Sequence, residues 1–224
     1  MAVIIKPSDI EKNSMEIISA ELAERGLSLQ PGTEAVVRRV IHTTADFDYA
    51  ENLAFTKDAV ARGVAALASG VGIVTDTNMA KAGVSKPALA RVGGTVDCFM
   101  ADPNVAAAAK EAGTTRAVMA MRHGAEVRPD AVYAIGNAPT ALLQLEEQMD
   151  AGMRPSLIVA VPVGFVNVVE SKERIFAACE KYDVPCIAAF GRKGGSNVAA
   201  AICNALLYAA ADLQDPEDRN WKTK

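Results

Sequence analysis

The chain has 224 residues, of which 50% are hydrophobic and 22% charged, with a formal net charge of -4 at pH 7. These values predict one domain with a large core over residues 1–212 and a polar tail over residues 213–224 that frays. The negative charge argues against a nucleic-acid surface, the apolar runs are too short to cross a membrane, and the N-terminus has no leader pattern, so a cytoplasmic protein is expected.

The first predicted helix covers residues 9–25, where apolar residues recur at helical spacing until Gly26. Ser8 and Glu11 have the spacing of a capping box at its start. Ser14 lies near the edge of the apolar stripe. A hydroxyl there faces either water or a ligand.

The second predicted helix covers residues 32–43 and carries one of the two histidines of the chain near its end. His42 follows Arg39 by three residues and Arg38 by four, so the three side chains share a helix face. One arginine could hold a carboxylate while the imidazole moves a proton, a task for which its pKa is suited. The alternative is a histidine stabilised by the helix dipole beside two solvated arginines.

An alanine-rich helix over residues 58–69 precedes a region that alternates between short apolar runs and helical patterns. The five apolar runs are residues 71–75, 96–100, 131–135, 157–161 and 186–190. Near-continuous apolar runs separated by helices are typical of parallel strands that are covered on both faces. The sequence therefore predicts an α/β fold with a doubly wound parallel sheet of about five strands and helices on both faces.

Ligands bind at the carboxyl ends of the strands in such folds, so the loops there are candidate sites. Distinctive loops follow four of the runs, at residues 75–79, 136–140, 162–166 and 191–197. The last combines Arg192, Lys193 and flexible glycines just before a long helix, as anion-binding loops do. It lacks the order of a P-loop or a dinucleotide-binding turn, and each loop alone could be a structural turn.

Other candidate residues are less distinctive. Arg116 follows two threonines that suit a helix cap, and it either faces the strand ends or is solvated. His123 is interpreted as a surface residue. Pro139 suits a first helical position, with Asn137 as a possible cap.

Several kinds of chemistry find little support in the residue pattern. There is no GxSxG or Cys-His signature of a nucleophilic enzyme. A carboxylate pair drawn from Asp46, Asp48 and Glu51 stays open, although acids in such loops more often cap helices. The four cysteines have no CxxC spacing and are interpreted as reduced core residues, so no protein-bound metal is implied.

The motifs, taken in order, resemble those of the precorrin-8X methylmutase family. They are RVIHTTADF at residues 39–47, TDTNM at 75–79, AIGNAPTAL at 134–142, PVGFV at 162–166, ESK at 170–172 and GRKGGSN at 191–197. The match covers about residues 5–210. Several motifs in register are far more specific than any single glycine loop.

The resemblance implies an isomerase of cobalamin biosynthesis that moves a methyl group from C-11 to C-12 of a corrin precursor. It also implies a flavodoxin-like fold, no external cofactor, and a homodimer that binds the macrocycle near the subunit interface. The HTTADF version of the motif is more similar to the branch acting on cobalt-precorrin-8, in which the cobalt belongs to the substrate.

The resemblance also assigns roles to individual residues. His42 matches the catalytic histidine, which protonates or hydrogen-bonds the tetrapyrrole. Ser14 and Arg39 match substrate-contacting positions, and Arg116 matches an arginine near the ring periphery. Ser85 falls where some relatives carry threonine, as a further substrate-binding candidate.

Two other classes of function remain as alternatives. A non-catalytic corrinoid-binding or carrier protein would keep the arginines and the 191–197 loop but would not depend on His42. A phosphate-binding module would use that loop alone and would ignore tetrapyrroles.

Overall fold

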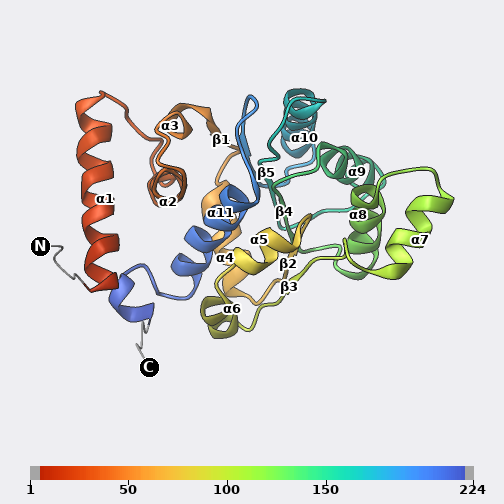
Figure 1. Cartoon of the computed structure of the whole chain (residues 1–224), viewed down its shortest axis with the longest axis horizontal. Helices are drawn as coiled ribbons and strands as arrows, with labels where there is room; N and C mark the ends of the chain where they lie inside the picture. Colours follow the sequence, from red (N-terminus) through yellow and green to blue (C-terminus); the bar gives the residue numbers. More distant parts are fainter. Residues whose placement is uncertain (1–5, 220–224) are drawn as a thin grey trace, which may run out of the picture.

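A six-stranded sheet forms the centre of the computed structural model, which describes residues 6–219 (Figure 1). Its strands are β1 (Leu53–Phe55), β2 (Ile73–Thr75), β3 (Val96–Asp97), β4 (Val132–Ile135), β5 (Leu157–Ala160) and β6 (Cys186–Ala189). They are ordered β1-β6-β5-β4-β2-β3. All neighbours run parallel except the edge strand β1, which pairs antiparallel with β6.

The predicted α/β fold and all five predicted parallel strands are confirmed. If only these parallel strands are numbered along the chain, their order is 2-1-3-4-5, the flavodoxin-like order. Strand β1 was not predicted, because it has three residues of which only Leu53 is buried.

Helices cover both faces of the sheet (Figure 1). One face carries α2 (Glu34–Thr44), α4 (Ala59–Ala68), α5 (Asn78–Gly83), α6 (Lys86–Val92) and α11 (Ser196–Ala210), and the other carries α7 (Pro103–Glu111), α8 (Arg116–Val127), α9 (Pro139–Asp150) and α10 (Val168–Lys181). In β4, Val132 and Ala134 join the core of the first face, whereas Tyr133 and Ile135 join that of the second. This alternation with both faces buried explains the uniformly apolar runs.

Helix α11 is the hub of the first face, and its apolar surface packs against α2, α4, α5 and α6. Helix α5 approaches it closely because Gly83 has no side chain. A Cβ atom at Gly83 would lie only 2.8 Å from the Cβ of Ala200. The small residue thus lets the loop between α5 and α6 lie directly over α11.

The predicted helix ends are partly right. Helix α1 (Pro7–Glu24) begins with a proline in its first turn and has no side-chain cap, so the capping box of Ser8 and Glu11 is wrong. Thr115 caps α8 by accepting a hydrogen bond from the backbone N–H of Val118. At α9 the residue in the cap position is Ala138, not Asn137.

The strand order reverses between β2 and β4, and at this point a buried carboxylate joins the loops that follow the two strands. The Asp76 side chain accepts hydrogen bonds from the backbone N–H groups of Gly136, Asn137 and Ala138 at 2.7–2.9 Å. Burial raises the pKa of Asp76, and these three hydrogen bonds oppose the rise. The crevice at this switch point is therefore occupied by the protein itself.

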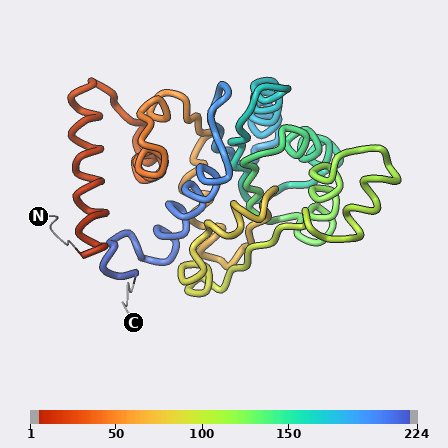
Figure 2. Tube along the Cα trace, viewed as in Figure 1, coloured from red at the N-terminus to blue at the C-terminus, as the bar shows by residue number. Residues whose placement is uncertain are grey.

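The segment that follows α11 folds back against α1 instead of extending away (Figure 2). Leu213 and Pro216 are buried, and Pro216–Arg219 forms a short 3-10 helix, η1. The expectation that the chain frays after Asp212 is therefore wrong for residues 213–219. Trp221, in the rest of the predicted tail, lies outside the described residues. Within the described part of the chain, no helix is long and apolar enough to cross a membrane.

Candidate functional site

Helix α2 presents His42 in its last turn. Val36, Val37, Val40 and Ile41 form its buried face, whereas His42 is exposed. The helix ends at Ala45, which adopts a left-handed conformation with φ of 53°. The imidazole is thus held at an open helix end, where a bound molecule can reach it.

Arg39 lies one helical turn before His42 and influences its ionisation. Partial desolvation of the exposed imidazole lowers the pKa of His42, the positive charge of Arg39 lowers it further, and Glu11 partly opposes both. A proton on the imidazole is therefore easier to give away than that of an ordinary histidine.

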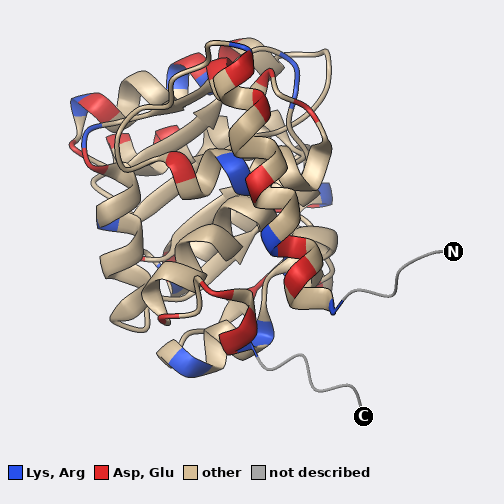
Figure 3. Ribbon diagram, turned by 90° about the vertical axis from the view of Figure 1, so that its left-hand side faces the viewer, with Lys and Arg blue, Asp and Glu red and all other residues tan. Residues whose placement is uncertain are grey.

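Arg39 belongs to a cluster that joins three distant parts of the chain. Its Nη2 atom lies 2.6 Å from Oε1 of Glu11, and the same oxygen lies 2.6 Å from Nη1 of Arg219. Both guanidinium groups lie over the ring of Tyr208. One carboxylate therefore faces two cations. Across this side of the molecule acidic and basic positions are interspersed (Figure 3).

Ser14 lies on α1, one turn after Glu11, and is partly buried. Its hydroxyl donates a hydrogen bond of 2.8 Å to the carbonyl of Ile10. The oxygen keeps lone pairs that can accept from another group. The structure thus brings Ser14, Arg39 and His42 to neighbouring turns of two packed helices.

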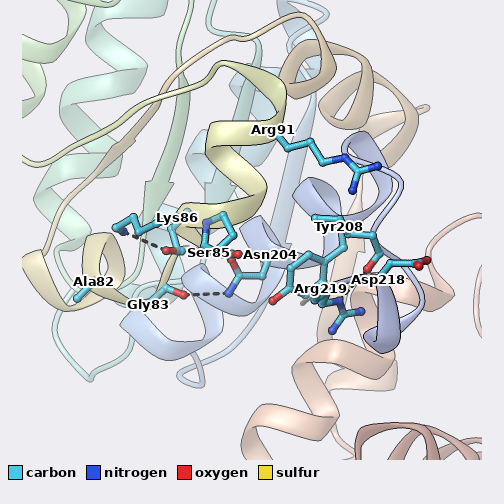
Figure 4. A pocket seen from close by; sticks show the side chains of 12 residues that line it. Ala82, Gly83, Ser85, Lys86, Arg91, Asn204, Tyr208, Asp218 and Arg219 are labelled. Atoms are coloured by element: carbon cyan, nitrogen blue, oxygen red, sulfur yellow. Dashed lines mark hydrogen bonds between the residues drawn. The ribbon is translucent and has the colours of Figure 1, made fainter. Parts of the chain in front are cut away.

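Ser85 lies in a cavity of about 520 Å³ between the α5–α6 loop, α11 and the C-terminal segment (Figure 4). Asn204 holds the loop, because its side chain accepts from the backbone N–H of Ser85 at 2.7 Å and donates to the carbonyl of Gly83 at 2.9 Å. The Ser85 hydroxyl accepts a hydrogen bond from Ala88 and so caps α6. Its first role is therefore structural.

Basic side chains line this cavity from two elements, and the Lys86 ammonium donates a hydrogen bond to the carbonyl of Val84. Lys86 and Arg91 come from α6 and Arg219 from η1, and Figure 4 shows Arg91 and Arg219 extending toward its Tyr208 end. Desolvation, and then the charge of nearby Lys81, lowers the pKa of Lys86. The acidic side chain among the lining residues is Asp218.

A smaller cavity of about 180 Å³ extends from the same place toward α2. It is lined by Arg38 and Arg39, and it shares Tyr208 and Arg219 with the larger cavity. Apolar lining residues include Met15, Ala205, Val84, Pro87 and Leu213. We call the two cavities together the trough. It combines aliphatic surface with an excess of positive charge, which suits a polyanionic organic ligand.

Arg116 does not join this group. It is exposed at the start of α8, on the opposite face of the sheet from α2 and α11. The hydroxyls of its neighbour Thr115 and of Thr140 lie 3.2 Å apart, which places Arg116 beside the start of α9. Within one chain, Arg116 is therefore separate from the trough.

The 191–197 loop uses its cations internally. The Lys193 ammonium lies 2.6 Å from Asp46 and also pairs with Asp48, and Arg192 stacks over Phe165. Beneath the loop, the fully buried Lys172 donates hydrogen bonds to the carbonyls of Gly191 and Lys193. This arrangement ties the end of α2 to the loop after β6 and weakens the case for an anion site there.

Sequence reasoning missed several residues of the trough, above all Tyr208 and Arg219. Glu11 carried a signal, since it lies one turn from Ser14, but it was taken for a capping residue. His123 is partly exposed and lies 3.8 Å from Glu126, as a surface residue would.

All four cysteines are free thiols, and among residues 6–219 no three His, Cys, Asp or Glu side chains are arranged to hold a metal ion.

Comparisons with known proteins give consistent matches. The family model described as precorrin-8X methylmutase matches residues 9–209. A cobalt-precorrin-8 methylmutase from Salmonella typhimurium is 45% identical over 93% of this chain and 98% of its own length. A precorrin-8X methylmutase from Pseudomonas aeruginosa is 40% identical, with coverages of 88% and 93%.

Solved structures agree with the sequence matches. The crystal structure of a precorrin-8X methylmutase from Thermus thermophilus superposes with a TM-score of 0.82 at 38% identity, covering 91% of this chain and 98% of that one. The chain belongs to the precorrin-8X methylmutase family, whose members are isomerases of cobalamin biosynthesis.

Proposed function

We propose that this methylmutase converts cobalt-precorrin-8 into cobyrinate by moving a methyl group from C-11 to C-12 of the macrocycle, formally a [1,5]-sigmatropic shift. The observation that carries the proposal is the position of His42, one helical turn from an arginine that lines a basic trough. Family membership supplies the reaction. The trough supplies a surface that fits a substrate with several carboxylate arms.

The substrate has an apolar ring and acidic periphery, and the trough offers both matching surfaces. In our proposal the ring rests on aliphatic side chains such as Met15, Ala205 and Val84. Arg39 binds a carboxylate, because a guanidinium fork matches the geometry of that group. Ser14 and Ser85 bind further polar groups of the ring periphery.

His42 then acts on the ring while these contacts hold it. Migration of a methyl group redistributes charge over the conjugated macrocycle, and a hydrogen-bond donor at the right edge stabilises that redistribution. The lowered pKa of His42 makes its protonated form a strong donor. We propose that His42 donates a proton or a hydrogen bond in this step.

We also propose a homodimer, because Arg116 could then approach the trough of a partner subunit. An exposed apolar surface supports an interface: the exposed fractions of Val163, Phe165, Val166 and Val169 are 47%, 81%, 77% and 38%. Arg192 stacks on Phe165 at the edge of this surface. Association would remove these side chains from water.

We propose that the reaction consumes no external cofactor and that any cobalt enters with the substrate, so that no metal is held by the protein. A rearrangement of one molecule needs positioning and charge stabilisation, which the side chains of the trough can provide. We further propose that the enzyme is cytoplasmic, a compartment that fits its free cysteines.

The two alternative functions are less well supported. A non-catalytic corrinoid carrier is not favoured, since the relatives at 35–45% identity are named methylmutases. A phosphate-binding module is weakened by the loop at residues 191–197, whose Lys193 is neutralised by Asp46 and Asp48.

An absorbance titration of the purified protein tests the proposed ligand class. Cobyrinic acid and hydrogenobyrinic acid are the two candidate products, and we expect saturable binding with a shifted spectrum. Preference for cobyrinic acid would support a cobalt-containing substrate. Absence of binding to both, with nucleotide binding instead, would contradict the proposal and favour the phosphate module.

A further inference from the structure

The residues after α11 supply part of the lining of the trough. They lie beyond residue 209, where the match to the family model ends. Nonetheless residues 213–219 are held firmly. Leu213 and Pro216 are buried, and Lys12 of α1 pairs with Glu217 at 2.8 Å and Asp215 at 3.1 Å.

Arg219 makes the most contacts in this segment. Its Nε donates to the carbonyl of Leu213 at 2.7 Å, its Nη2 to the carbonyl of Gln214 at 2.8 Å, and its Nη1 to Glu11 at 2.6 Å. The side chain is only 6% exposed, and the guanidinium lies 3.8 Å from the centre of the Tyr208 ring. One side chain thus bends the segment into a hook and joins it to α1 and α11.

The hook also forms part of the trough. Leu213, Asp218 and Arg219 line the larger cavity, and Gln214 and Arg219 line the smaller one. Helix α6 lines the larger cavity together with the hook, and α2 lines the smaller one. Without it, both cavities would be open along one side.

Arg219 changes the charge that a ligand meets beside Tyr208, although the hook also carries Asp218 in the cavity lining and Asp215 and Glu217, which pair with Lys12. Glu11 has one negative charge, and Arg39 and Arg219 each bring a positive one, so the cluster keeps a net positive charge beside Tyr208. Were Arg219 absent, the Glu11 carboxylate would neutralise Arg39 alone. Arg219 therefore leaves Arg39 with more attraction for an acidic ligand, even though its own N–H groups are engaged.

From this geometry we infer that residues 213–219 are a fixed wall of the corrinoid site and that Arg219 is its positioning residue. The inference rests on the proposed ligand class, because it assigns a polycarboxylate macrocycle to the trough. The hook then determines affinity by its shape and by the charge of Arg219. It does not touch His42, so it leaves the chemical step largely unchanged.

The test compares Arg219→Met, Arg219→Lys and a matched control, Arg62→Met. Arg62 makes a similar pair of contacts, to the carboxylate and the carbonyl of Asp183, and lines neither cavity of the trough. For Arg219→Met we expect the Kd for cobyrinic acid and the KM to rise about tenfold, with kcat within about twofold of wild type. Arg219→Lys keeps the charge and should recover part of the affinity.

Arg62→Met should leave Kd, KM and kcat unchanged. A purely structural role for Arg219 would lower the melting temperature and the active fraction without raising KM, and that result would overturn the inference. So would an unchanged Kd. If wild type binds no corrinoid at all, the proposed function fails, which is a separate outcome.

Hydrogen exchange of the wild-type protein gives a readout that does not depend on folding of a variant. Saturating cobyrinic acid should slow exchange of the amides in residues 213–219, since the ligand would lie against them. Unchanged exchange in this segment, with slower exchange elsewhere in the trough, would overturn the inference while leaving the proposed function intact.

Discussion

The Oε1 atom of Glu11 lies 2.6 Å from the Nη2 atom of Arg39, and this contact joins α1 to the helix that carries His42. The two side chains are only 12% and 15% exposed, so water screens their charges weakly. The pair therefore fixes the side chain next to His42. It also sets the electrostatic surroundings of the imidazole.

We expect Glu11→Gln to lower the free energy of unfolding by about 1–3 kcal/mol near pH 7, because two buried guanidinium groups lose a charged acceptor. Burial raises the pKa of Glu11, but the hydrogen bonds and charges of Arg39 and Arg219 outweigh this, and the net pKa lies below 4.5. A carboxyl group whose pKa is lowered in the folded protein stabilises the fold at pH values above the pKa of that group in the unfolded chain. The difference between wild type and variant should therefore disappear as the pH falls through the folded pKa.

Denaturant unfolding at several pH values measures this difference. Glu16→Gln, at an exposed position of the same helix, is the matched control and should have little effect at any pH. Equal stability of wild type and Glu11→Gln near pH 7 would contradict the account of the cluster.

We expect Arg39→Gln to move the inflection in the pH profile of kcat/KM toward higher pH. Burial and the charge of Arg39 lower the pKa of His42, so removal of that charge lets the pKa rise. If protonated His42 is the donor, activity falls as the pH rises through this pKa. Arg62 lies outside the trough, so Arg62→Gln is the control and should leave the inflection at the same pH. An unshifted inflection in Arg39→Gln would mean that another group controls the profile.

We expect Lys172→Met to lower the free energy of unfolding by about 1–3 kcal/mol, since two carbonyls lose their donor. Desolvation lowers the pKa of Lys172 from 10.5 to about 8. At pH values between these two pKa values, Lys172 is protonated in the unfolded chain and deprotonated in the folded one. Wild-type stability should therefore rise relative to the variant with increasing pH, by up to about 1.4 kcal/mol per pH unit.

Paired unfolding curves near pH 7 and near pH 9.5 test the Lys172 prediction. Lys181→Met, at an exposed position of the same helix, controls for the loss of a lysine from α10. A difference between wild type and Lys172→Met that is the same at both pH values would show that Lys172 stays charged in the folded protein.

The sequence predicted the parallel strands well because the central ones are buried on both faces, as β4 and β5 are throughout, whereas the short edge strand β3 is only partly buried. Strand β1 was not predicted because three residues with one buried side chain give no clear strand pattern. Its antiparallel pairing depends on contacts with β6, over a hundred residues away. Such pairings are set by tertiary structure.

The candidate site was predictable only where its residues are close in sequence. Helical spacing correctly placed Arg39 beside His42. Glu11, Tyr208 and Arg219 meet through the packing of three separate elements, and no local pattern joins them. The same limit explains why Glu11 was mistaken for a capping residue.

We propose that His42 performs the chemistry while the trough binds the macrocycle. Turnover of cobalt-precorrin-8 by wild type and His42→Ala, together with binding of cobyrinic acid to both, tests it most directly. We predict that the variant keeps its fold and a Kd within about threefold of wild type but loses a factor of about 10²–10⁴ in kcat. Turnover near the wild-type rate in His42→Ala would contradict the claim.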